Sequence, residues 1–69
     1  MTRNETKQVI KILFTAYPHY YKDATDESLR EMVDLYWEML REYPAQTVGI
    51  ALKKYIKTNK YPPTIAGIV

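Results

Sequence analysis

The chain has 69 residues, a formal net charge of +2 at pH 7 and no cysteine. A chain of this length supports one small hydrophobic core, which argues against an enzyme with a deep cleft. Without cysteine there are no disulfides, no thiolate zinc site and no cysteine nucleophile, so stability must come from the packing of apolar side chains.

The charges are unevenly distributed along the chain. Residues 1–42 contain six Lys or Arg and all eight acids, whereas residues 43–69 contain four lysines and no acid. The start of the chain is polar and no apolar run reaches membrane-spanning length, so neither a signal peptide nor a membrane segment is expected. We therefore expect the protein to act in the cytoplasm.

Prolines at positions 18, 44, 62 and 63 divide the chain into three segments of helical length and a short tail. Thr2 and Glu5 have the spacing of a capping box, and Pro18 forces Tyr17 out of helical geometry. The first helix is expected at about residues 3–17. Its inward face follows from the apolar positions at helical spacing: Val9, Ile10, Leu13, Phe14 and Tyr17.

A loop is expected over residues 18–24, after which Thr25 can cap a second helix at about 26–43. The apolar stripe of this helix is wide enough to contact two neighbours, so it is the expected centre of the core. The stripe consists of Leu29, Met32, Val33, Tyr36, Trp37 and Leu40, widened by Leu35 and Met39.

Pro44 suits the first turn of a third helix at about 45–58, and Asn59 suits a left-handed stop. The inward positions of this helix are Val48, Ala51, Leu52, Tyr55 and Ile56. After a stiff Lys-Tyr-Pro-Pro connection, Thr64 can cap a fourth helix that starts at 65. Its inward positions are Ile65, Ile68 and Val69, and five residues are too few for a stable helix, so we expect a longer parent protein.

Together these segments predict one all-α domain over residues 1–69, a small three-helix bundle with a truncated fourth helix at its C-terminal end. The flexible C-terminal region of the parent protein is expected to be absent from this chain.

No combination of side chains indicates catalysis, a cofactor or a metal. His19 is the single histidine and has no cysteine nearby, so it lacks both co-ligands and a nucleophile. No glycine-rich phosphate loop is present. The acids of the second helix favour a solvated face over a cation site or an acidic patch for a basic partner; they are Asp26, Glu27, Glu31, Asp34, Glu38 and Glu42. We therefore predict a non-catalytic protein.

The basic C-terminal part of the chain is the candidate partner-binding surface, formed by Lys53, Lys54, Lys57, Lys60 and Tyr61. Lysines attract phosphates, but without arginine, glutamine or asparagine on the same face they read base edges poorly. A surface that merely confers solubility explains the same lysines. Tyr20, Tyr21 and Tyr61 fall in expected loops, where a tyrosine can stack on a base or anchor a protein.

Several stretches resemble the helicase loader/inhibitor proteins of Bacillus phages. They are Ala16-Tyr-Pro-His-Tyr-Tyr-Lys, Trp37-Glu-Met-Leu with Tyr43-Pro, Ala51-Leu-Lys-Lys-Tyr-Ile, and Thr58-Asn-Lys-Tyr-Pro-Pro-Thr-Ile-Ala. The resemblance covers nearly the whole chain. It implies a folded helical N-terminal domain followed by a flexible C-terminal half, in a protein that binds and inhibits the phage's hexameric replicative helicase and loads it at the initiator-bound origin.

The resemblance also implies that the missing C-terminal tail makes the main helicase contact, with the origin-binding initiator as second partner and no requirement for nucleic acid. Gly67 stands where that family would have an acidic helix former, which weakens the expected fourth helix. Two alternatives remain open. One is a small DNA-binding replication initiator or organiser module that uses the basic Lys/Tyr surface, and the other is a regulatory helical protein with a helix-in-groove partner.

Overall fold

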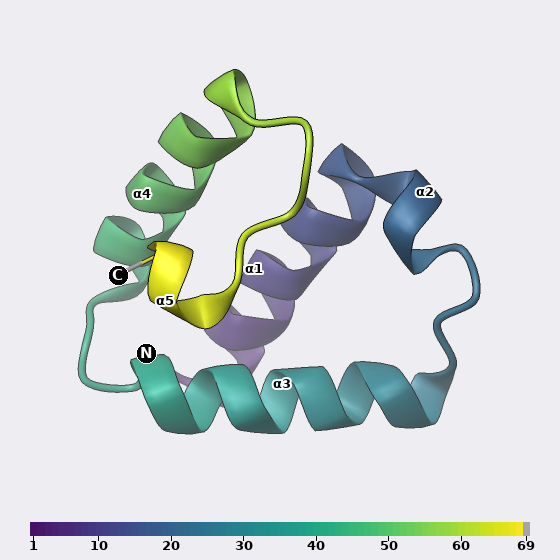
Figure 1. Cartoon of the computed structure of the whole chain (residues 1–69). Coiled ribbons are helices and arrows are strands. Elements are labelled where there is room, and N and C mark those ends of the chain that lie inside the picture. Colours follow the sequence, from purple (N-terminus) through teal and green to yellow (C-terminus); the bar gives the residue numbers. More distant parts are fainter. Residues whose placement is uncertain (69) are drawn as a thin grey trace.

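The computed structural model describes residues 1–68, which fold into five helices and contain no strand (Figure 1). The helices are α1 (Arg3–Ala16), α2 (Pro18–Tyr21), α3 (Asp26–Leu40), α4 (Ala45–Thr58) and α5 (Ile65–Ile68). The expected all-α bundle is therefore confirmed. Val69, one of the three expected inward positions of the last helix, lies outside the described residues.

Hydroxyl side chains fix the start of both long helices that precede Pro44. At α1 the Thr2 Oγ1 accepts from the Glu5 N–H at 3.1 Å, and the Glu5 carboxylate accepts from the Thr2 N–H at 2.8 Å. At α3 the Thr25 Oγ1 accepts from the Ser28 N–H at 3.1 Å, and the Ser28 hydroxyl oxygen accepts from the Thr25 N–H at 2.8 Å. Both expected caps are confirmed, and each satisfies backbone donors that a helix leaves unpaired.

The core is centred on α1, so the prediction that the second helix forms its centre was wrong. Four residues of α1 are buried, and this helix contacts α2, α3 and α4. In α3 only Tyr36 and Leu40 are buried, while Leu35 and Met39 are 51% and 56% exposed. The wide apolar stripe of α3 thus contacts other helices along one part only. The buried hydrophobic residues are Val9, Ile10, Leu13, Tyr17, Tyr36, Leu40, Val48, Leu52 and Ile68.

The prolines set helix ends that differ from the expected ones. Residues 18–24 were expected to form a loop, but Pro18 occupies the first turn of the short helix α2, where its missing N–H costs nothing. The helix expected to run to residue 43 ends at Leu40, and a turn follows in which Tyr43 N donates to Leu40 O at 3.0 Å. Pro44 is the N-cap of α4 rather than a first-turn residue, with an extended ψ of 142°.

The end of α4 also differs from the expectation. Asn59 is extended, with φ −129°, and not left-handed; its side-chain amide instead donates to Tyr55 O at 2.9 Å and satisfies a terminal carbonyl of the helix. The chain then returns so that α5 contacts α4. Thr64 caps α5 as expected, because its Oγ1 accepts from Gly67 N at 3.3 Å, and Ile68 is buried.

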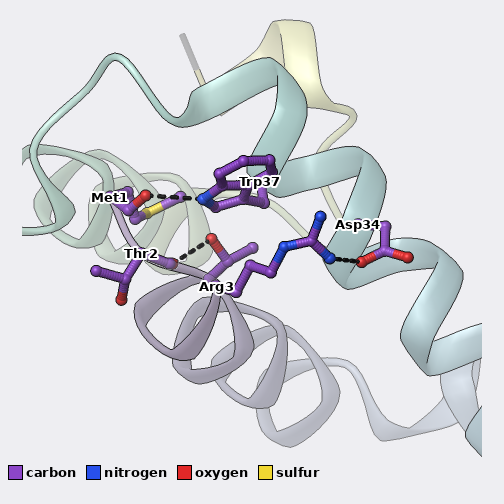
Figure 2. A network of polar contacts seen from close by, with 6 residues as sticks. Met1, Thr2, Arg3, Asp34 and Trp37 are labelled. Atoms are coloured by element: carbon purple, nitrogen blue, oxygen red, sulfur yellow. Dashed lines mark hydrogen bonds and ion pairs between the residues drawn. The ribbon is translucent and has the colours of Figure 1, made fainter.

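The first residues of the chain connect α1 to the C-terminal end of α3 (Figure 2). The Met1 ammonium donates to Arg41 O at 2.9 Å, and the Trp37 Nε1 donates to Met1 O at 3.0 Å. The Arg3 guanidinium pairs with Asp34 and lies 4.6 Å from the centroid of the Trp37 ring. These contacts fix the angle at which α3 crosses α1 and place positive charge at the negative end of the α3 dipole.

Candidate interaction surface

A groove lies between α1 and α4, which run in the same direction along one side of the molecule (Figure 1). The two helices are held together at their C-terminal ends, where the buried Tyr17 hydroxyl donates to Asn59 O at 3.0 Å. The groove has a volume of about 540 Å³ and is lined by Gln8, Lys11, Ile12, Thr15, Ala16, Lys53, Ile56 and Lys57. We call this set of residues the α1–α4 groove.

Two of the five residues expected on a partner surface line the α1–α4 groove. Lys53 and Lys57 are exposed and lie one turn apart on α4, and Lys11 of α1 lies in the same lining. Sequence reasoning missed Lys11, because it falls on the polar side of the first segment and nothing in the local pattern relates it to residues more than forty positions later. The half-buried Ile12 and Ile56 supply apolar side chains between these lysines.

The three lysines of the groove have no acidic partner within residues 1–68. The one ion pair there joins Arg3 to Asp34, and it lies at the α1–α3 crossing. The lining of the groove contains no Asp or Glu. Its positive charge is therefore balanced only by solvent and is free to act on a partner.

The other three expected residues lie outside the α1–α4 groove. Lys54 is exposed on α4 and Lys60 is exposed after its end, but neither lines the groove. Tyr61 is 65% exposed and meets Tyr20 of α2 edge to face, with ring centroids 5.8 Å apart. The structure thus separates the predicted surface into a basic groove and an aromatic contact beyond the ends of α1 and α4.

The tyrosines expected in loops have different environments. Tyr21 stacks on Phe14, with centroids 4.5 Å apart and an interplanar angle of 10°, and burial raises the pKa of its phenol. Tyr20 is 53% exposed and also packs edge-on against Tyr17 at 6.5 Å. Tyr21 is therefore a packing residue, whereas Tyr20 and Tyr61 present ring surface to solvent.

The remaining candidate chemistry is dispersed over the surface. His19 is exposed on α2, and residues 1–68 contain no group of three or more His, Cys, Asp or Glu that could hold a metal ion. The six acids of α3 and the turn after it are exposed, and Asp34 is paired with Arg3. A second hollow, of about 470 Å³, lies between α1 and α3 and has both charges in its lining: Arg3, Asn4, Lys7, Asp26, Leu29, Arg30 and Val33.

No helix within residues 1–68 has the length and apolar character needed to cross a bilayer.

Comparison with known families gives one match, which spans the chain. The family model that describes the N-terminal domain of the phage helicase loader/inhibitor matches residues 1–69. Searches of curated proteins and of solved structures return no match.

Proposed function

The chain belongs to the family formed by the N-terminal domains of phage helicase loader/inhibitor proteins, and from this premise we propose that it takes part in loading the phage's hexameric replicative helicase at the origin. In this role the protein binds the helicase, holds it inactive and releases it when the origin-bound initiator competes. The observation that carries the proposal is the family match over the whole chain.

A loader of this kind acts as an adaptor, and the helicase retains the ATP hydrolysis. The amino-acid sequence agrees with this division of labour, since it contains neither a glycine-rich phosphate loop nor a cysteine. The 69 residues form a domain whose unpaired lysines and exposed apolar side chains are available for contact with other proteins. We place its action in the cytoplasm of the infected host, where the helicase works.

The flexible C-terminal half implied by the resemblance is the proposed main helicase contact. A disordered segment that folds on binding loses conformational entropy, so it binds with low affinity for the area it covers. Such a contact is readily displaced by a competing protein, and reversibility is what a loader requires. The folded domain then presents the second contact, either to the initiator or to the helicase.

The proposal is tested by mixing the full-length parent protein with the replicative helicase of the same phage, with and without ATP. We expect a complex by size-exclusion chromatography, a reduced ATPase rate of the helicase, and recovery of that rate when the initiator is added. A chain that ends at residue 69 should retain little of the inhibition. If neither nucleotide state gives a complex and the ATPase rate is unchanged, the proposed function is wrong.

A further inference from the structure

The α1–α4 groove combines an apolar floor with an unpaired basic rim, and we propose that it binds an acidic amphipathic helix of a partner protein. This inference deepens the proposed function and rests on it, because it assigns the folded domain a partner surface of its own. The observations that carry it are the two isoleucines in the lining, Ile12 and Ile56, and the three lysines around them, Lys11, Lys53 and Lys57.

The length of the groove suits two turns of a partner helix. The α1 wall runs from Gln8 to Ala16, which is about 12 Å at 1.5 Å per residue. A helix of that length presents apolar side chains at positions i and i+4, or i, i+4 and i+7, to a groove of this kind. Ile12 and Ile56 are half-buried in the free chain, so contact with such side chains removes further apolar surface from water.

The charge of the groove specifies an acidic partner. All eight acids of the chain lie in residues 1–42, none of them lines the groove, and within residues 1–68 none pairs with its lysines. Lys53 and Lys57 are one helical turn apart, with Lys11 contributed by the opposite wall. Glutamates three or four positions apart on a partner helix match this spacing, and the complementary charge raises the rate of association and selects the partner.

The lining disfavours the other common modes of recognition. Residues 1–68 contain no strand, so there is no sheet edge to which an extended peptide can add. The groove has no aromatic side chain, which removes both the platform for a polyproline ligand and the stacking surface for nucleic acid bases. It also lacks arginine, the residue that pairs bidentately with phosphates and guanines. An acidic protein helix uses both the apolar and the basic side chains of the lining.

The test uses the chain labelled with ¹⁵N and three probes in separate NMR titrations. The first is a designed helical peptide with leucines at i, i+4 and i+7 and glutamates beside them, the second is the same peptide with lysine at each glutamate, and the third is a single-stranded oligothymidylate. We expect the acidic peptide to shift the amide signals of the α1–α4 groove and the lysine peptide to leave them in place.

Two double variants with equal changes in net charge locate the contact. Lys53→Glu with Lys57→Glu should weaken binding of the acidic peptide by about tenfold or more, whereas Lys54→Glu with Lys60→Glu, outside the groove, should leave it within about twofold. Circular dichroism checks that both variants fold. If the first pair unfolds, Lys53→Gln with Lys57→Gln replaces it, and the same ordering of affinities is expected.

Three outcomes would overturn the proposal: no shift with the acidic peptide, shifts outside the groove, or groove shifts with the oligothymidylate alone. Groove shifts that depend on the concentration of the free chain would also overturn it, in favour of a second copy. The same variants are then tested for binding to the initiator and to the helicase. If the wild-type chain and its full-length parent bind neither protein, the proposed function fails, while the peptide titration still decides what the groove binds.

Discussion

Tyr17 combines three roles in one side chain. It ends α1 because Pro18 disfavours helical geometry at the preceding residue, and its ring is 6% exposed within the core. Its hydroxyl reaches Asn59 O at the far end of α4, at 3.0 Å. A phenol is suited to this position because it buries an aromatic ring while its O–H keeps a partner.

Replacing Tyr17 by phenylalanine tests the contribution of that hydroxyl. The ring still fills its site, but Asn59 O loses its donor, so we expect the Tm of unfolding to fall by roughly 4–8 °C. Thermal unfolding followed by circular dichroism measures the change. Tyr20→Phe is the matched control: the Tyr20 ring is 53% exposed, and removal of its hydroxyl should leave the Tm unchanged. Equal Tm values for the two variants would contradict the role given to the Tyr17 hydroxyl.

At the scale of helices, local chemistry at the ends determines where each element starts. The caps formed by Thr2 with Glu5 and by Thr25 with Ser28 use side chains within three residues of each other, and both start the helix at the position that the sequence predicts. The hydrogen bonds from the Thr2 backbone and side chain hold the pKa of Glu5 below its ordinary value, so this cap loses stability as the pH falls through that lowered pKa. Helix ends at Leu40 and Asn59 depend on longer turns, and there the predictions differ from the structure.

Thr25→Ala removes the side-chain cap of α3 and should lower the free energy of unfolding by about 1 kcal/mol. The reason is that the Ser28 N–H loses its acceptor at 3.1 Å. Thr25→Asp keeps an acceptor at the same place and adds negative charge at the positive end of the helix dipole, so it should retain the stability of the wild type. Chemical denaturation with Trp37 fluorescence compares the three proteins; a loss of stability in the aspartate variant as large as in the alanine variant would argue against capping.

Gly49→Ala should stabilise α4 by about 0.5–1 kcal/mol, because alanine has the higher helix propensity. An added Cβ at position 49 meets no heavy atom within 4 Å, and no glycine in residues 1–68 has a positive φ. Gly67→Ala is the comparison: its Cβ would lie 3.5 Å from Pro63 Cβ, an ordinary contact, and it belongs to a helix of four residues, so the gain should be smaller. A fall in the unfolding free energy for Gly49→Ala would show that the site is less open than described.

At the scale of the whole molecule, α1 is the element on which the others pack. It contacts α2, α3 and α4, and α5 joins through α4. Three tyrosines contribute to this packing, and burial raises the phenol pKa of each: Tyr17, Tyr21 and Tyr36. The neutral phenol is therefore the form that the folded state favours.

The raised phenol pKa values predict a loss of stability at alkaline pH. A phenol with a higher pKa in the folded than in the unfolded state contributes its full stability below the unfolded pKa of about 10, and loses it as the pH rises through the folded pKa. The Tm should therefore decrease above about pH 10, and less steeply in Tyr36→Phe, which cannot ionise at that position. Thermal unfolding by circular dichroism across this range checks the slope, and identical slopes for both proteins would contradict the assignment to Tyr36.

Much of the fold follows from the sequence, and less of the interaction surface does. The caps, the prolines and the apolar spacing predict an all-α bundle, and Tyr17, Tyr36 and Leu52 are buried as expected. Of the five residues expected on a partner surface, Lys53 and Lys57 meet in one groove, while Lys54, Lys60 and Tyr61 lie elsewhere. The spacing along α4 places these lysines on a helix face, but it does not indicate which helix lies beside that face.

The sequence by itself determined where the helices begin and which face of each is apolar, because caps, prolines and helical periodicity act between residues a few positions apart. Only the tertiary structure decided that α1 is the centre, that Leu35 and Met39 face solvent, and that Lys11 and Ile12 lie opposite Lys53, Ile56 and Lys57. These features depend on contacts between segments some forty residues apart, and the packing of whole helices selects them.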